Sequence, residues 1–419
     1  MKHELKKTLK PVELFLAVSL IATVTACGPS AETEGGEGGE GATTEQVEGG
    51  EGGEGGEGSE GGEGGEGGEG GEGGEGGEGG EGGEGGEGGE GAVVPSDVLP
   101  GFADNVVIPT YVELVAQAKN LKAGVDTFVA NPTDESLTAT QEIWTNARFS
   151  WEQSEAFAFG PAESLGFDGD LDDWPVNEVD LQAVIDSDDE ITDEYISELQ
   201  TTQKGYHAIE MLLFGKAADK TVDAFTPREL ELLSALVKNF ESTASGLLDS
   251  WTDGVDGNPA YREVLATAGS PDNPAYPTLN AAAEEIVQGI IGCLEEVGEE
   301  KIGAPIASRD VSEFESQFSQ TTLNDLHNNI ISAQNAYLGM LPNGTASENS
   351  ISSLIQSVDA SLDADVKLQF DTALALIKEV PGPIEATLDD ADAEAAFVKA
   401  QESILGLYET FEDKVLPII

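Results

Sequence analysis

The chain has 419 residues, and its 81 acidic residues outnumber its 19 basic residues to give a formal net charge of −62. Residues 92–419 alone hold 59 acidic and 15 basic residues, so a nucleic-acid partner and binding to anionic lipid head groups are both disfavoured. The two cysteines are Cys27, directly after the N-terminal signal, and Cys293 in an apolar run, so we expect no internal disulfide and a buried Cys293.

The N-terminal segment has the pattern of a secretory signal. Lysines precede an apolar segment at 12–24 that is too short to span a bilayer. The segment ends in Val-Thr-Ala before Cys27, which resembles a bacterial lipobox, where the cysteine carries the lipid. We expect a signal peptide over 1–26 and a membrane anchor at Cys27. Because glycine follows the cysteine, an outer-membrane or cell-surface position is favoured; the alternative is an ordinary secretory signal with an incidental cysteine.

Residues 27–91 are predicted to be a disordered tether. Positions 28–91 contain 20 glutamates and no lysine or arginine, mostly as Glu-Gly-Gly repeats. Such a segment cannot bury apolar surface, and as a Gly-rich coil it would span roughly 45 Å. We expect it to hold a folded periplasmic or extracellular domain away from the lipid surface.

The remaining residues are predicted to be all-α, most simply as two packed helical bundles. Apolar residues recur at helical spacing, and alternating strand patterns are scarce. A Gly/Pro-rich linker at 253–277 would separate an N-terminal bundle at 92–252 from a C-terminal bundle at 278–419. Helices are expected at about 104–130, 134–159, 190–213, 227–251, 278–301, 320–338, 350–358, 361–380 and 389–415.

Asp-rich residues 161–190 are interpreted as a solvated loop. The alternation of Asp168, Asp170 and Asp172 begins like a calcium-binding loop. The pattern then fails, because the positions that need a glycine and a bidentate glutamate hold Asp173 and Val179. At most a weak calcium site is expected there.

The strongest chemical pattern is Gly205-Tyr206-His207-Ala208-Ile209-Glu210. Residues three apart share one helix face, and a histidine with a carboxylate in an apolar segment is typical of a transition-metal site. The alternative is a hydrogen-bonded pair without a metal. After the signal is removed, His207 and His327 are the remaining histidines. His327 lies beside the apolar face of the helix predicted at 320–338. It either faces a groove between the bundles or is an ordinary histidine at the edge of the core.

Several motifs, in the same order along the chain, resemble motifs of the imelysin family. Gly205–Glu210 is similar to its Gly-x-His-x-x-Glu signature, and the segments 148–161, 173–175, 315–319 and 328–339 are similar to other motifs of the family. The resemblance implies a two-bundle, all-α fold with a cleft between the halves, and surface or periplasmic, often lipid-anchored members tied to iron acquisition. Gln317 stands where the family resemblance leads us to expect a basic residue, and its lack of charge would weaken the binding of an anionic ligand.

By this resemblance, His207 and Glu210 become metal-ligand candidates. The candidates for lining the cleft are Arg148, Glu152, Glu155, Glu315, Ser316 and Ser319. The expected cargo is iron or an iron-bearing ligand such as haem, with zinc as the other metal and an iron-uptake receptor as a further partner. Two alternatives stay open: a zinc metallopeptidase, since the family bears that label, and a surface scaffold in which the motif only ties two helices together.

Overall fold

The computed structural model describes residues 92–419, and in this range it contains helices and connecting turns but no β-strand. The all-α prediction is therefore confirmed. The predicted signal peptide, Cys27 and the tether lie outside the described residues.

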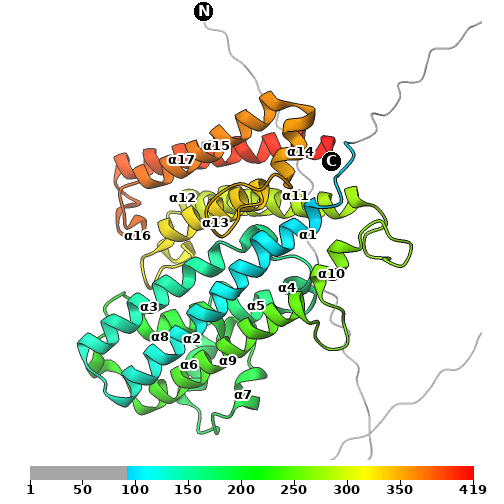
Figure 1. Ribbon diagram of the computed structural model, residues 1–419. Coiled ribbons are helices and arrows are strands. Elements are labelled where there is room, and N and C mark those ends of the chain that lie inside the picture. The colour runs from blue at the N-terminus through cyan, green and yellow to red at the C-terminus, as the bar shows by residue number, and fades with distance from the viewer. Residues whose placement is uncertain (1–91) are drawn as a thin grey trace, which may run out of the picture. The chain divides into compact units, whose positions relative to one another are not determined.

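The N-terminal half is built around four longer helices in the lower part of Figure 1, where α2 packs on α3 and α9, and α8 lies against both α3 and α9. Val98–Val107 extends α2 toward the N-terminus as one continuous helical stretch. The helices of this half are α1 (Val98–Phe102), α2 (Ile108–Ala130), α3 (Asp134–Glu152), α4 (Pro161–Ser164), α5 (Phe167–Asp172), α6 (Glu178–Asp186), α7 (Asp193–Ser197), α8 (Gly205–Phe214), α9 (Pro227–Thr252) and α10 (Tyr261–Ala266).

In the C-terminal half, α15 pairs with α17 at the top of Figure 1, and α11 and α13 lie beneath them. A π-helix at Glu296–Gly303 follows α11. The helices are α11 (Leu279–Glu295), α12 (Ala304–Ser308), α13 (Thr322–Leu338), α14 (Ile351–Val358), α15 (Ala360–Glu379), α16 (Ile384–Thr387) and α17 (Ala391–Thr410). The two halves meet where α13 packs on α3 and where α11 and α13 both pack on the 3₁₀ turn Glu155–Phe157.

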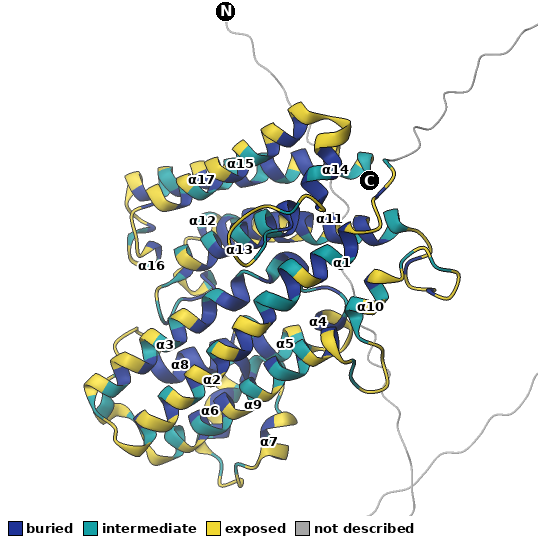
Figure 2. Cartoon of the chain, viewed as in Figure 1, coloured by how far each residue is buried: buried dark blue, intermediate teal, exposed yellow. Residues whose placement is uncertain are grey.

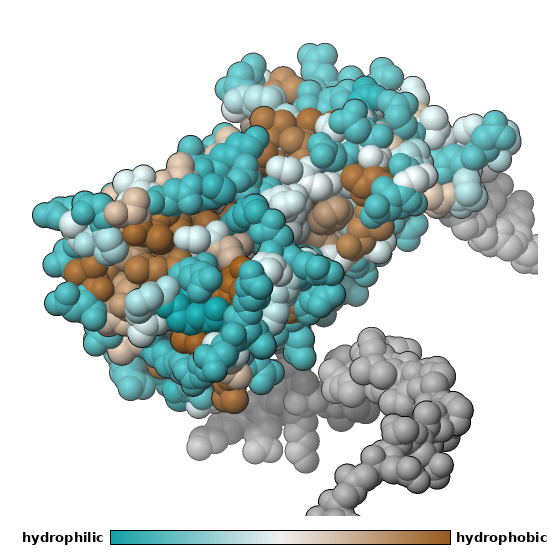
Figure 3. Space-filling model, turned by 90° about the horizontal axis from the view of Figure 1, so that it is seen from below, coloured by the Kyte–Doolittle hydropathy of each residue, from teal (hydrophilic) through white to brown (hydrophobic). Residues whose placement is uncertain are grey.

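Buried residues line the facing sides of the helices in both halves (Figure 2). Hydrophilic atoms cover much of the face seen in Figure 3, and the hydrophobic atoms there form separate patches. Val98–Ala130 is the one described stretch that is long and apolar enough to cross a membrane, but half of its most apolar window is buried in the protein. We therefore assign this stretch to the core.

Several helix ends follow the local sequence signals. The first long helix ends at Asn131, and Gly215 and Gly339 follow the ends of α8 and α13. The capping box of α9 is formed: Thr226 accepts a hydrogen bond from the backbone N–H of Glu229, and the Glu229 side chain accepts one in return. These ends depend on backbone conformation within one turn, which is why the sequence predicts them well.

The second predicted helix, 134–159, is too long, because α3 ends at Glu152. Beyond this point the chain turns to contact the C-terminal half. The backbone N–H of Ala156 donates to Ser332 Oγ on α13 (3.0 Å), and a Cβ on Gly289 of α11 would lie 2.4 Å from the Ala156 carbonyl oxygen. Tertiary contacts therefore override the helical periodicity and place Glu155 outside the helix.

The prediction for residues 161–190 is wrong, since this segment forms α4, α5 and α6 rather than a loop. The helix expected to begin at 190 begins only at Gly205, after α7 and a 3₁₀ turn at Thr201–Gln203. Gly205 has φ +77°, and a Cβ there would lie 2.5 Å from the carbonyl oxygen of Leu171. Glycine is thus required to start α8 directly against the end of α5.

The proposed boundary at 253–277 stays a prediction. This stretch contains α10 between turns that hold the positive-φ residues Gly254, Gly257 and Gly269.

Candidate metal centre

The centre is organised around His207, whose side chain is only 1 % exposed. Its Nδ1 lies 3.1 Å from Glu210 Oε2, and its Nε2 lies 3.2 Å from Asp172 Oδ1 at the end of α5. Glu210 is held in turn, because its Oε1 accepts hydrogen bonds from the backbone N–H (2.8 Å) and the hydroxyl (2.7 Å) of Ser319. Glu210 therefore orients the imidazole, and Nε2 points toward Asp172.

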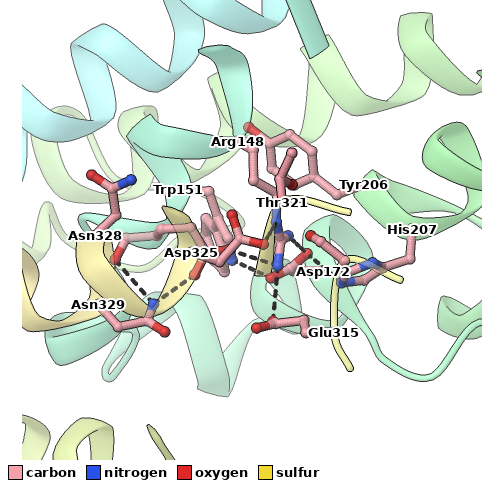
Figure 4. Close-up of polar contacts among 12 residues, drawn as sticks. Arg148, Trp151, Asp172, Tyr206, His207, Glu315, Thr321, Asp325, Asn328 and Asn329 are labelled. Atoms are coloured by element: carbon pink, nitrogen blue, oxygen red, sulfur yellow. Dashed lines mark hydrogen bonds and ion pairs between the residues drawn. The ribbon is translucent and has the colours of Figure 1, made fainter. Parts of the chain in front are cut away.

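A buried arginine connects the same carboxylate to the C-terminal half. Arg148 on α3 forms ion pairs with Asp172, with Glu152 (2.6 Å) and with Glu315 (2.8 Å). Figure 4 shows Asp172 between Arg148 and His207. The guanidinium carbon also lies 5.2 Å from the ring centroid of Tyr206, the neighbour of His207 in the motif.

Two further contacts lock this arrangement. Trp151 Nε1 donates to the second oxygen of Asp172 (2.6 Å). Asn329 on α13 donates to Glu152 Oε2 (2.5 Å), so the network spans both halves of the molecule. Asp172 thus holds its position through groups on three sides.

The charges at the centre are set by these pairs. Burial and Arg148 disfavour protonation of His207, but Asp172 and Glu210 outweigh both and raise the pKa of the imidazole to about 9. Burial would raise the pKa of Asp172, yet Arg148 and His207 lower it below its usual range. At neutral pH and without a metal, an imidazolium therefore lies between carboxylates.

The other carboxyl groups divide into charged and neutral ones. Burial would raise the pKa of Glu315, but Lys301 and Arg148 lower it, so Glu315 is anionic. Burial raises the pKa of Glu152 to about 7 against the pull of Arg148, and burial raises the pKa values of Glu155 and Asp325 well above their usual range. The centre therefore contains fewer negative charges than carboxyl groups.

A pocket of about 650 Å³ opens beside these residues and is lined from both halves of the protein. Lys301 is the only basic residue among its lining side chains, and Cys293 lies in its wall. Burial raises the pKa of the Cys293 thiol well above its usual range, which fits the predicted buried role. The acidic residues that line the pocket are Glu155, Glu163, Asp168, Asp172, Asp173, Glu296, Glu300 and Glu315.

Two groups of side chains in the described residues could hold a metal ion. One is Asp172, His207 and Glu315, with one ligand atom from each residue within 4.8 Å of the others; the second is Glu152, Glu155 and Asp172. His207 Nε2 and Glu315 Oε2 are buried, and their near partners are charged groups: Nε2 lies 3.2 Å from Asp172 Oδ1, and Oε2 lies 3.1 Å from the ammonium of Lys301. An imidazole nitrogen and carboxylate oxygens that lie this close together are the ligand types that bind a transition-metal cation.

The predicted candidates fall into different places. Arg148, Glu152, Glu155 and Glu315 lie in or beside the pocket, as described above. Ser316 is fully buried with a hydroxyl that lacks a hydrogen-bond partner, and Ser319 holds Glu210. His327 lies on α13, where burial and Lys378 lower its pKa, and it belongs to neither metal-capable group.

Gln317 stands apart from this network. Its side-chain amide donates to the backbone carbonyl of Ser312 (3.1 Å), an exposed contact.

Sequence reasoning missed Asp172, Lys301 and Asp325. Asp172 was assigned to a loop, although Asp168 and Asp172 have the i, i+4 spacing of one helix face. Lys301 and Asp325 belong to no recognisable sequence motif. They matter only because Lys301 is buried beside Glu315 and Asp325 is buried beside Arg148.

Comparison with known proteins identifies the family. The family model for imelysin matches residues 107–410. Iron-regulated protein A of Synechococcus elongatus is 38 % identical over 328 residues, which cover 78 % of this chain and 88 % of the relative.

Two solved structures share the fold. One, from Parabacteroides distasonis and described as a candidate iron-regulated protein A precursor, is 26 % identical with a TM-score of 0.67, covering 77 % of this chain and 94 % of that one. The other, an imelysin-like protein from Psychrobacter arcticum, is 13 % identical with a TM-score of 0.54, covering 78 % and 98 %. The signature around His207, the helical fold and the match over most of the chain agree, and the protein belongs to the imelysin family.

Proposed function

We propose that this protein captures an iron ion in the acidic pocket, with Asp172, His207 and Glu315 as its protein ligands. Glu210 would then hold the imidazole rather than bind the metal, because both of its oxygens are already engaged. The observation that carries the proposal is that one ligand atom of buried His207 lies within 4.8 Å of an oxygen of Asp172 and of Glu315, two carboxylates that line the pocket. The similarity to iron-regulated protein A supports iron as the metal.

The ligand set suits a borderline or hard divalent cation, because one imidazole and two carboxylates are typical ligands of iron, manganese and zinc. Remaining coordination positions would be filled by Glu155, water or a small chelating molecule. The acidic lining of the pocket, in which Asp172 and Glu315 are anionic, favours a cation over haem, whose propionates are anionic.

The predicted lipid anchor at Cys27 completes the proposal. A tethered domain at the outer membrane or cell surface would meet iron outside the cell and could pass it to an uptake receptor.

The test is metal titration of the purified protein by calorimetry, with elemental analysis of the bound metal. We expect about one ion per chain and a loss of affinity of at least about tenfold in His207→Ala. His327→Ala is the matched control, since it removes the other histidine of residues 92–419 without touching either metal-capable group. Unchanged stoichiometry and affinity in His207→Ala would contradict the proposal.

We do not extend the proposal to peptide hydrolysis, because no observation favours it. His327, the second imidazole that a zinc site might have used, lies in neither metal-capable group of the described residues.

A further inference from the structure

We propose that the Lys301 ammonium is a displaceable cation that pairs with Glu315 in the absence of metal and must leave this carboxylate when the metal binds. This inference rests on the proposed function and names the group that regulates access to the same site. Lys301 Nζ lies 3.1 Å from Glu315, one of the three proposed ligands, and its side chain is 8 % exposed.

The electrostatic surroundings explain why the ammonium is there. Burial disfavours a charged lysine, but Glu315, Glu155 and Glu296 outweigh burial and hold the pKa of Lys301 well above its usual range. Without a metal, the carboxylates need a positive charge, and Lys301 supplies one from the pocket wall. Glu315 already pairs with Arg148 (2.8 Å) and with Lys301, so a metal ion would bring a third positive charge to one carboxylate. The repulsion among these charges makes the ammonium and the metal compete for Glu315.

The local backbone gives the ammonium a second partner. Lys301 Nζ also lies 3.5 Å from Glu296 Oε1, five residues earlier, and the Glu296 side chain is 46 % exposed. On an α-helix, residues five apart point about 140° away from each other. The π-helix Glu296–Gly303 brings them nearly into line, because its hydrogen bonds join residues five apart.

This geometry provides a path for exchange. The ammonium can leave buried Glu315 and remain paired with half-exposed Glu296, so it need not pass unpaired through the pocket. Its departure frees Glu315 for the metal, and loss of the metal restores the original ion pair. The π-helix packs closely on α17, since Gln401 Nε2 donates to the Gly298 carbonyl oxygen (2.8 Å), and the side chain rather than the helix would move.

The first test compares the metal affinities of wild type and Lys301→Met, measured with Fe²⁺ under anaerobic conditions and with Mn²⁺ or Zn²⁺ as probes. Methionine keeps much of the aliphatic stem and removes the competing charge, so we expect binding at least about tenfold tighter. Lys220→Met is the control, because Lys220 forms a partly buried ion pair with Glu229 (2.6 Å) outside the pocket. Unchanged or weaker binding by a folded Lys301→Met protein would overturn the inference.

The second test does not depend on the folding of Lys301→Met. Glu296→Gln removes the partner that receives the ammonium, whereas Glu300→Gln removes the same charge from the same pocket without touching the Lys301 ion pairs. We expect Glu296→Gln to weaken metal binding several-fold more than Glu300→Gln. Equal effects of the two variants would show that Lys301 is only a fixed counter-ion.

The outcomes separate the inference from the proposed function. If neither wild type nor Lys301→Met binds metal, both fail. If wild type binds metal at His207 but Lys301→Met binds no more tightly, the metal site stands and the displaceable cation is rejected. If only Lys301→Met binds, the ammonium blocks the site, which supports the inference, while capture by the native protein is contradicted.

Discussion

At the scale of single residues, the charge on His207 connects stability with metal binding. The pKa of the imidazole is raised to about 9 because Asp172 and Glu210 favour the imidazolium over burial and Arg148. A histidine that binds a metal must be neutral, so metal binding to His207 near pH 7 has to release a proton. The affinity for metal should therefore increase with pH up to about 9.

The same shift predicts a pH-dependent stability. Because the folded-state pKa of His207 lies above the unfolded value near 6.5, its stabilisation is complete below about pH 6.5 and is lost as the pH rises through about 9. A shift of this size corresponds to a contribution on the order of 3 kcal/mol at full effect. The loss in unfolding free energy caused by His207→Gln should thus be larger at pH 7 than at pH 10, measured by urea denaturation without metal.

His327→Gln provides the control for this prediction. Burial and Lys378 lower the pKa of His327, so its neutral form dominates at both pH values. An equal stability loss for His207→Gln at pH 7 and pH 10 would contradict an imidazolium between Asp172 and Glu210.

Glu210→Gln tests the residue that holds the imidazole. Glutamine can still accept from Ser319, but it removes the negative charge 3.1 Å from His207 Nδ1. We expect the pKa of His207 to fall by about one unit or more toward its ordinary range. The measurement is a titration of the His207 ring protons by NMR, and an unchanged pKa would mean that Asp172 alone holds the charge.

At the scale of elements, the start of α8 places the motif beside α5. Gly205 has φ +77°, and a Cβ would meet the Leu171 carbonyl oxygen at 2.5 Å. Asp172 and His207 face each other because the two helix ends approach this closely. The glycine of the signature is therefore explained by packing rather than by contact with a ligand.

Gly205→Ala should destabilise the fold by about 2–4 kcal/mol, from backbone strain and from the clash with Leu171 together. Gly166→Ala is the matched control, since Gly166 has φ +75° and no atom within 4 Å of the added Cβ. It should cost only about 1 kcal/mol from the left-handed backbone alone. Urea denaturation of both variants gives the difference, and equal losses would contradict a steric role for the Gly205–Leu171 approach.

The errors of element prediction have two causes, tertiary contacts at helix ends and a misleading acidic composition. Helix ends set by a local signal, such as Gly215 or the Thr226 capping box, agree with the structure. The end of α3 and the start of α8 were misplaced because contacts with α11 and α5 decide them. Residues 161–190 were misread because acidic composition suggested a solvated loop, whereas their apolar residues include buried Leu171 and Leu181.

At the scale of the whole molecule, the proposed metal would join the two halves. Asp172 and His207 come from the N-terminal half, and Glu315 comes from the C-terminal half. Existing contacts already bridge the same boundary, including Gln153 to Asn328 (2.7 Å). A bound cation should strengthen this boundary.

We therefore expect metal to stabilise the whole protein. At a free metal concentration one hundred times Kd, the gain is about 2.7 kcal/mol, which should raise Tm by several degrees relative to protein in a chelator. Hydrogen exchange should slow both near His207 and in the 314–321 segment. Thermal scans of His207→Ala with and without metal are the control, and an equal metal-induced shift in this variant would place the bound ion elsewhere.

The sequence by itself determined the helical class, several helix ends and the pairing of His207 with Glu210, because these depend on neighbours within one or two turns. It also indicated the family through motifs that keep their order along the chain. Only the tertiary structure decided that Asp172 and Glu315 come together with His207 in one metal-capable group, and that Lys301 lies against Glu315. These residues are far apart in the sequence, and their charges and pKa values arise from burial and mutual contact, which no local pattern encodes.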